Sequence, residues 1–117
     1  PVLDVHTNPA NPVIGNRSFG TTPEAVEQHA LAFWRGLREV GVAGCGKHFP
    51  GHGDTRTDSH ATLPVIEHDE ARLRAVELRP FVAAIRAGVE ATMTANVVVT
   101  AWDAAEPAAV VRRLGTG

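Results

Sequence analysis

The sequence has few of the residues that build disulfide scaffolds or membrane-spanning helices. Its 117 residues include a single cysteine, Cys45, so no internal disulfide can form. Aromatic residues make up only 5% of the chain, and tyrosine is absent. No uninterrupted apolar run approaches the roughly 20 residues that a transmembrane helix requires. We therefore expect no membrane segment in this stretch, and we expect Cys45 to be a small buried side chain in a strand.

Neither sign of charge predominates. Eleven Lys and Arg residues oppose thirteen Asp and Glu residues, which gives a formal net charge of −2. This balance provides no electrostatic reason to expect binding to nucleic acid or to an anionic membrane. With 44% hydrophobic residues, the chain has the composition and length of one globular domain. Its function must therefore be sought in particular residues.

Short apolar segments alternate with helical patterns along the chain. Three candidate strands lie at 1–5, 42–46 and 92–99. Between them lie two candidate helices, which begin near Thr22 and Asp69. Strands that alternate with helices predict right-handed crossovers and a parallel sheet covered by helices. The fold class expected is therefore α/β.

Each candidate helix has recognisable ends. Thr22 and Pro23 have the residue types of an N-cap and a first helical position, and Gly41 has the type of a C-terminal cap. Pro80 is expected to kink or restart the second helix, and Gly88 to end it. The apolar positions expected to face the core are Val26, Ala30, Phe33, Leu37 and Val40 in the first helix, and Leu73, Val76, Phe81, Ala84 and Ile85 in the second.

The two long loops at 6–20 and 48–63 follow the first two candidate strands. In parallel α/β folds the carboxyl ends of the strands form the edge where ligands bind. Residues 47–60 contain three of the six histidines, two aspartates and a lysine, among glycines and a proline that oppose a regular helix. Imidazole and charge are costly to bury without partners, so this density on a loop indicates a functional site.

Asp58 and His60 are the most suggestive pair in this stretch. A carboxylate beside an imidazole favours the protonated ring, and such a pair can act as a general acid that becomes a general base in a second step. A hydrogen bond that only staples the loop would use the same two residues. Lys47 leaves a similar choice between a fixed donor for hydroxyl or carboxylate groups and a solvated surface lysine.

The same stretch could also be interpreted as a metal site, because zinc accepts imidazole and carboxylate ligands. The candidate ligands are His48, His52, Asp54, Asp58 and His60. Pro50 and Gly51 prevent His48 and His52 from sharing a helix face, and Lys47 would place a positive charge beside the cation. We therefore expect no metal.

Four other residues receive no role in the predicted site. His29 and His68 are expected to be plain surface residues. Trp34 and Trp102 are expected either on the exterior of the fold or at a subunit contact.

Residues 47–60, Lys-His-Phe-Pro-Gly-His-Gly-Asp-Thr followed by Thr-Asp-Ser-His, resemble the signature of glycoside hydrolase family 3. More narrowly, they resemble its β-N-acetylhexosaminidase branch. Similarity to that branch also covers 1–5, 11–19, Phe33 with Gly36-Leu37, and 78–81. The resemblance thus extends over nearly the whole chain, and agreement over fourteen positions of the motif is too long for chance.

The resemblance implies a (β/α)8 barrel that catalyses retaining hydrolysis of terminal β-linked N-acetylglucosamine, in peptidoglycan turnover by bacteria or in chito-oligosaccharides. The acid/base of that branch is a histidine paired with a loop aspartate, which correspond to His60 and Asp58. A lysine–histidine pair that binds sugar hydroxyls corresponds to Lys47 and His48, and a substrate-binding arginine corresponds to Arg17. The implied partner is a carbohydrate, and no cofactor is implied.

Parts of the family pattern have no counterpart in this sequence. Neither the nucleophilic aspartate of a Ser-Asp-Asp-like motif nor an earlier loop aspartate that grips the sugar is present. A complete barrel needs about 200 residues or more. We therefore expect 1–117 to be a central fragment of the catalytic barrel, a partial TIM barrel of about three consecutive βα units with both ends missing, and inactive alone. Asn96 stands where the family often has histidine.

Two other functions fit the same residues. One is a β-N-acetylglucosaminide phosphorylase, because a histidine acid/base tolerates an incoming phosphate better than a carboxylate would. The other is a non-catalytic, sugar-binding pseudo-enzyme in which Lys47, His48 and Arg17 still hold a sugar.

Overall fold

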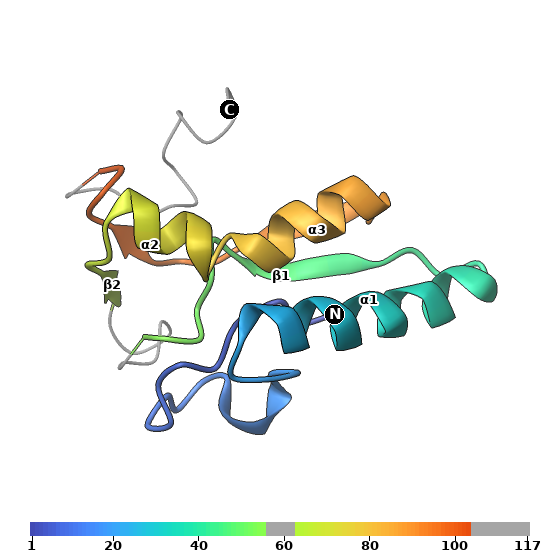
Figure 1. Cartoon of the computed structure of the whole chain (residues 1–117), viewed down its shortest axis with the longest axis horizontal. Coiled ribbons are helices and arrows are strands. Elements are labelled where there is room, and N and C mark those ends of the chain that lie inside the picture. The colour runs from blue at the N-terminus through green and yellow to red at the C-terminus, as the bar shows by residue number, and fades with distance from the viewer. Residues whose placement is uncertain (56–62, 104–117) are drawn as a thin grey trace.

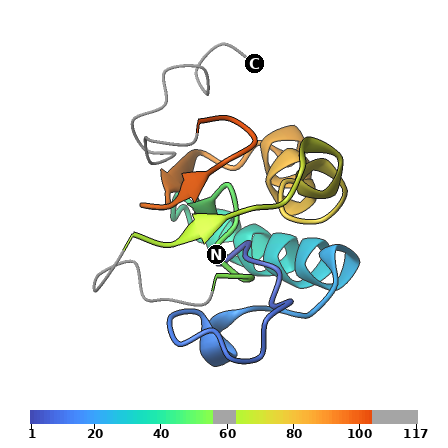
Figure 2. The same ribbon diagram turned by 90° about the vertical axis from the view of Figure 1, so that its left-hand side faces the viewer.

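The computed structural model describes residues 1–55 and 63–103. Its elements are a short 3₁₀ helix η1 (Gly15–Arg17), α1 (Pro23–Glu39), β1 (Cys45–Phe49), β2 (Val65–Ile66), α2 (Glu70–Ala75), α3 (Arg79–Ala87), β3 (Ala91–Thr94) and β4 (Val98–Val99). Figure 1 shows α1 and α3 alongside β1, and Figure 2 shows the helices mostly to one side of the strands. The fold is α/β, as predicted. None of the helices in these two ranges is long and apolar enough to cross a membrane.

The strands of the described residues pair in parallel, which confirms the expected direction. β1 pairs with β3, placing Cys45 opposite Ala91. β2 pairs with β4 in a second sheet of two short strands. The strand expected at 1–5 is reduced to one parallel bridge between Val2 and Lys47. Cys45 is in a strand as expected, although it is only half-buried.

Two strand boundaries differ from the prediction, because neighbouring groups occupy the backbone. The strand expected at 42–46 begins only at Cys45, since Val42 N–H donates to Leu37 O of the helix end and Gly44 N–H donates to the Glu90 carboxylate. The strand expected at 92–99 divides into β3 and β4. Between these two strands, Ala95 N–H donates to Phe49 O at 2.7 Å.

Helix α1 has the predicted ends. Thr22 Oγ1 accepts a hydrogen bond from Ala25 N–H at 3.3 Å, and the chain leaves the helix through Gly41 at φ 76°. Its buried residues are Val26, Ala30 and Trp34. The prediction was wrong for Phe33 and Val40, which are 52% and 75% exposed.

The second predicted helix is two helices, α2 and α3, because Pro80 lies in the first turn of a new helix. Asp69 caps α2 by accepting a hydrogen bond from Arg72 N–H at 2.8 Å. Gly88 ends α3 at φ 97°, as expected. Ile85, predicted to face the core, is 63% exposed.

Two clusters of buried apolar side chains support the carboxyl end of β1. The first joins the N-terminal segment to α1 and α3 through Leu3, Val5, Val26, Ala30, Phe81 and Ala84. The second packs α2 against the second sheet through Ile66, Leu73, Ala95, Val97 and Val99. Phe49 lies between them, because its ring meets Phe81 edge-on at 5.3 Å and stacks on Trp102 at 6.2 Å.

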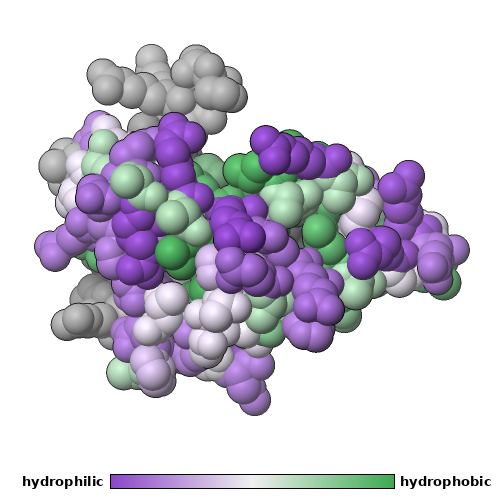
Figure 3. Space-filling view, in the orientation of Figure 1, coloured by the Kyte–Doolittle hydropathy of each residue, from purple (hydrophilic) through white to green (hydrophobic). Residues whose placement is uncertain are grey.

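Trp34 does not lie on the exterior of the fold, which was one of the two positions predicted for the tryptophans. Trp34 is buried, and its indole N–H donates to Glu90 Oε2 at 2.9 Å. Trp102 is half-buried and donates to Glu70 Oε2 at 2.8 Å. Figure 3 shows hydrophobic side chains scattered among hydrophilic ones on the helical face.

Candidate active site

The candidate site begins within β1 rather than after it. Because β1 extends to Phe49, Lys47 and His48 belong to the strand itself, whereas the sequence placed them where strand gives way to loop. Lys47 N–H donates to Pro1 O at 3.1 Å, and Leu3 N–H donates to Lys47 O at 2.6 Å. The N-terminal segment thus fixes the backbone that carries both predicted sugar-binding side chains.

Asp4 is the centre of the hydrogen bonds at this strand end. Its side chain has no exposed surface. Asp4 Oδ2 lies 2.7 Å from His48 Nδ1, and Asp4 Oδ1 accepts from His52 N–H at 2.6 Å. The backbone N–H of His48 also donates to both carboxylate oxygens at 3.2 Å. A carboxylate only accepts, so His48 Nδ1 carries the proton and Nε2 is the ring nitrogen left for another group.

Asp4 had no role in the site predicted from the sequence. A signal was present, because an aspartate inside the apolar run Val-Leu-Asp-Val must find hydrogen-bond partners if the run is buried. The partners of Asp4 depend on how residues 1–5 pack against residues 45–52, and no local sequence pattern predicts this packing. In the structure Asp4 contacts His48 and His52, near the start of the motif.

Hydrogen bonds from Asn11 also fix the turn that follows β1. Asn11 Nδ2 donates to His52 O at 2.6 Å and to Thr55 Oγ1 at 3.2 Å, and the His52 ring contacts the same hydroxyl. Gly53 fits because a Cβ there would lie 1.9 Å from Val5 O. His52 is 2% exposed and therefore belongs to the packing of this turn. The peptide bonds preceding His48 and Pro50 are cis.

Arg17 lies in η1 on the neighbouring loop, with an exposed side chain. Its Nε and one terminal nitrogen donate to Val13 O at 3.2 and 2.7 Å. The structure therefore ties Arg17 to its own loop, and its role toward a sugar stays a prediction. Asp58 and His60, the predicted acid/base pair, lie outside the described residues.

Asp54 and His68 stand at the two sides of that undescribed stretch and contact each other through Oδ2 and Nε2. Asp54 Oδ1 also accepts from Thr7 Oγ1 at 2.8 Å. Glu77 Oε1 lies 3.9 Å from His68 Nε2 and accepts from Arg72 at 3.0 Å. The expectation that His68 is a plain surface residue was wrong, because its side chain is 29% exposed and paired.

Two opposing effects set the pKa of Asp54. Burial raises it, but hydrogen bonds from Thr7 and His68, together with the charges of His68 and Arg72, bring the pKa below its ordinary value. Asp54 is therefore held as a carboxylate.

A metal could be held by one group within 1–55 and 63–103, namely Asp54, His68 and Glu77, whose ligand atoms lie within 4.8 Å of one another. Of the ligands considered from the sequence, this group includes only Asp54. Arg72 already supplies a positive charge to Glu77. The contacts present therefore fit an ion-pair network, and we assign no metal to it.

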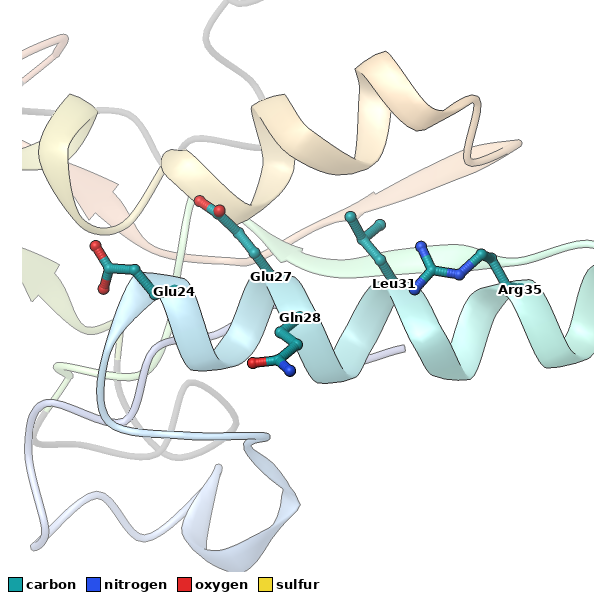
Figure 4. A pocket seen from close by; sticks show the side chains of 5 residues that line it. All are labelled: Glu24, Glu27, Gln28, Leu31 and Arg35. Atoms are coloured by element: carbon teal, nitrogen blue, oxygen red, sulfur yellow. The ribbon is translucent and has the colours of Figure 1, made fainter.

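A separate surface depression lies on α1, lined by Glu24, Glu27, Gln28, Leu31 and Arg35 (Figure 4). Arg79 of α3 pairs there with Glu24 at 2.5 Å and with Glu27 at 2.9 Å. None of the motif residues that the structure describes, 47–55, lines it. His29, expected at the surface, is exposed on the same helix.

Nearly the whole chain is similar in sequence to known proteins. Residues 1–116 match the family described as the glycosyl hydrolase family 3 N terminal domain. A beta-hexosaminidase of Methylococcus capsulatus is 46% identical over 107 residues, which are 92% of this chain and 32% of that protein. The chain thus spans about a third of that curated relative's length.

Solved structures give the same result. A glycoside hydrolase family 3 beta-N-acetylglucosaminidase from Paenibacillus is 49% identical with a TM-score of 0.89, over 92% of this chain and 20% of that one. NagZ from Neisseria gonorrhoeae, solved in complex with N-trifluoroacetyl-D-glucosamine, is 46% identical with a TM-score of 0.85, over 92% and 31%.

Proposed function

The chain belongs to glycosyl hydrolase family 3, and on that premise we propose that it supplies the sugar-binding and acid/base residues of a β-N-acetylhexosaminidase. The substrate proposed is a terminal β-linked N-acetylglucosamine in peptidoglycan fragments or chito-oligosaccharides. The names of the relatives support the sugar, because one is a beta-N-acetylglucosaminidase and another binds an N-acylglucosamine analogue. The finer choice of glycan is our proposal alone.

The observation that carries the proposal is the fixed position of His48 at the end of β1. A side chain that binds hydroxyl groups must present one defined nitrogen, and Asp4 holds Nδ1 so that Nε2 is presented. His48 Nε2 is then free to form a hydrogen bond with one sugar hydroxyl, and the ammonium group of Lys47, the preceding residue, is a donor to another. Two polar groups of this kind suit the vicinal hydroxyls of a pyranose.

We assign the proton transfers to His60, oriented by Asp58. In the first step His60 donates its proton to the glycosidic oxygen while a carboxylate attacks the anomeric carbon, and the aglycone leaves as an alcohol. In the second step His60 takes a proton from water, which displaces the enzyme carboxylate from the sugar with a second inversion. The nucleophile is proposed to lie on a family motif that does not occur in these 117 residues.

The parallel strands and covering helices are proposed to form part of a (β/α)8 barrel. In such a barrel, catalytic side chains gather at the carboxyl ends of the strands. Lys47, His48 and the turn that follows them lie at that end of β1. This agrees with the edge predicted from the sequence.

The test is to follow the full-length protein acting on an aryl β-N-acetylglucosaminide by NMR. We expect release of N-acetylglucosamine, with the β-anomer formed first because two inversions restore configuration. First formation of the α-anomer, or no turnover, would overturn the proposal. No turnover together with N-acetylglucosamine binding would favour a sugar-binding pseudo-enzyme.

Added phosphate separates hydrolysis from phosphorolysis. A histidine acid/base carries no negative charge to repel phosphate, which is the physical argument for a phosphorylase. We expect free N-acetylglucosamine as the product at all phosphate concentrations. Accumulation of N-acetylglucosamine 1-phosphate would instead identify a phosphorylase.

A further inference from the structure

Asn8 and Asn11 are the same kind of residue in the same local setting. Each asparagine precedes a proline, and each side-chain oxygen accepts a hydrogen bond from the backbone N–H two residues later, as in an Asx-turn. The two differ in burial, because Asn11 is 4% exposed whereas Asn8 is half-buried. A buried amide needs partners at both of its polar ends, and the proposed chemistry gave Asn11 no role.

Every hydrogen-bonding position of the Asn11 amide is used. Its Oδ1 accepts from Val13 N–H and Ile14 N–H, each at 2.9 Å. Its Nδ2 donates to His52 O at 2.6 Å and to Thr55 Oγ1 at 3.2 Å. Two donors facing the oxygen and a carbonyl facing the nitrogen fix the direction in which the amide points. Asn11 therefore joins the chain that enters η1 to the turn that follows β1.

Arg17 is attached to the same two residues that Asn11 holds. Arg17 N–H donates to Ile14 O at 2.9 Å, and its guanidinium donates to Val13 O through Nε at 3.2 Å and a terminal nitrogen at 2.7 Å. Two of the five guanidinium N–H groups are used in this way, and the others remain for a ligand on this exposed side chain. Within the described parts of the chain, the hydrogen bonds of 12–17 go only to one another or to Asn11. The other anchor of this stretch is the buried Ile14 side chain.

The opposite end of the Asn11 amide leads to His48. His52, whose carbonyl accepts from Asn11, donates its own N–H to Asp4 Oδ1 at 2.6 Å. Asp4 Oδ2 lies 2.7 Å from His48 Nδ1. A continuous series of hydrogen bonds thus connects the loop that carries Arg17 to His48, and these are predicted sugar-binding residues from two different loops.

A second contact holds the chain near Arg17 in a different way. Ser18 Oγ donates to Asp4 O at 2.6 Å, so the backbone that follows Arg17 is also fixed. The orientation of the guanidinium is a separate matter, because its two bonded nitrogens donate to Val13 O, and Val13 N–H is held by Asn11. Loss of the Asn11 donors would therefore let the guanidinium move while the end of the loop stays in place.

We propose that Asn11 is a positioning residue for substrate binding, and that its side chain sets where the Arg17 guanidinium stands relative to His48 so that both bind one sugar. The inference rests on the proposed function. Two groups that bind one rigid ring must keep a fixed separation. A hydrogen bond to a charged group is worth about 10–100-fold in affinity, so a misplaced guanidinium should weaken binding measurably.

The experiment measures KM and kcat for an aryl β-N-acetylglucosaminide, and the inhibition constant of N-acetylglucosamine, in the full-length protein. Asn11→Ser keeps a hydroxyl that can accept from Val13 N–H, but its shorter side chain cannot reach His52 O. We expect KM and the inhibition constant to rise about 10-fold in Asn11→Ser, with kcat nearly unchanged. Asn11→Ala removes the acceptor as well and should raise both constants at least as much.

Asn8→Ala is the matched control. Asn8 contacts the same turn, because its Nδ2 donates to Thr55 O at 3.1 Å, but its oxygen accepts from Ala10 N–H rather than from the residues that hold Arg17. This substitution should lower the melting temperature without changing KM. An equal rise in KM for Asn8→Ala and Asn11→Ser would mean that any loosening of the turn impairs binding, and it would overturn the proposal.

The Arg17→Ala background provides the decisive comparison. Arg17→Ala should itself raise KM, and because Asn11 acts through Arg17, adding Asn11→Ser should raise KM no further. Rises that multiply in the double variant, or an unchanged KM in Arg17→Ala, would overturn the proposal. An unchanged KM in Asn11→Ser beside a raised KM in Asn11→Ala would do the same, since Asn11 would then shape only its own loop.

Folding and function are separated by the remaining outcomes. If one Asn11 variant is too unstable to assay, the other carries the comparison with Arg17→Ala. Failure of both to fold, while Asn8→Ala folds, would show that Asn11 serves only the fold and would overturn the positioning role. A wild-type protein that neither hydrolyses the glycoside nor binds N-acetylglucosamine would refute the proposed function instead, so the two failures are distinguishable.

Discussion

Asp4 and His48 lie 44 residues apart in the sequence, yet Asp4 Oδ2 is 2.7 Å from His48 Nδ1. The carboxylate has no exposed surface, and its other partners are the backbone N–H groups of His48 and His52. One buried side chain therefore orients a proposed sugar-binding ring and also holds the turn that follows it. Substitutions at Asp4 can therefore test both the stability of the fold and the binding of substrate.

Asp4→Ala should destabilise the full-length protein by about 2–4 kcal/mol, because it leaves at least the buried His52 N–H without an acceptor. Asp4→Asn keeps one acceptor oxygen and should cost less, but its amide group cannot serve both N–H donors and the His48 ring. We therefore expect a raised KM in Asp4→Asn with little change in kcat. Urea denaturation and steady-state kinetics provide the two measurements.

Asp69→Ala is a suitable control for this change, because Asp69 is exposed and its side chain accepts the hydrogen bond from Arg72 N–H that caps the start of α2. Loss of such a cap costs about 0.5–2 kcal/mol and should leave KM unchanged. If Asp4→Asn and Asp69→Ala had the same kinetic effect, Asp4 would have no special relation to His48.

Much of the framework was predictable, because the relevant signals are local. Thr22 and Asp69 cap the starts of their helices, and Gly41 and Gly88 follow the helix ends, as predicted. These positions were predictable because capping depends on a few neighbouring residues. Parallel pairing also followed from the alternation of elements. The start of β1 was wrong by three residues, because the distant Glu90 takes up the Gly44 N–H.

The site was predictable only where the motif itself carried the information. Lys47 and His48 were identified from the motif, but their support by Asp4 depends on packing between segments far apart in sequence. His68 was misjudged for the same reason, because its partner Asp54 lies across the loop and Glu77 lies beyond the next helix. Long-range pairs of this kind leave no periodic pattern.

Gly53→Ala should be strongly destabilising, by about 3 kcal/mol or more. The added Cβ would lie 1.9 Å from Val5 O, a backbone atom that cannot move without disturbing the Asp4 segment. Gly36→Ala is the matched control, because Gly36 lies in α1 with nothing within 4 Å of the added Cβ. That substitution should stabilise the protein by about 0.5–1 kcal/mol. Thermal unfolding of both variants is the measurement, and equal melting temperatures would contradict this packing.

Lowering the pH should weaken the Asp54 contacts. Because hydrogen bonds and nearby positive charge hold the pKa of Asp54 below its ordinary value of 3.8, its stabilising effect is complete above that pH. The effect is lost as the pH falls through the lowered value. The difference in unfolding free energy between wild type and Asp54→Asn should therefore shrink as the pH falls below about 4. Glu67→Gln, at an exposed carboxylate, serves as the control; a difference for Asp54→Asn that does not shrink would contradict the pairing.

His60→Ala should remove protonation of the leaving group. General acid catalysis contributes about 10²–10⁴-fold, and a poor alkyl leaving group needs all of it. A nitrophenyl leaving group departs without a proton, so kcat/KM on that substrate should fall much less. Rates on a series of aryl and alkyl β-N-acetylglucosaminides measure this difference. The same fractional loss across the series would indicate a binding or folding role for His60.

Asp58→Asn should shift the pH dependence of the reaction rather than only its rate. The asparagine keeps the shape of the side chain but removes the charge that stabilises an imidazolium at His60. His60 then loses its proton at lower pH, so the alkaline limb of the kcat/KM profile should move downward. A metal ligand at Asp58 would behave differently, because a chelator would abolish activity and added zinc would restore it. An unchanged pH profile in Asp58→Asn, or sensitivity of the wild-type protein to chelator, would reject the dyad.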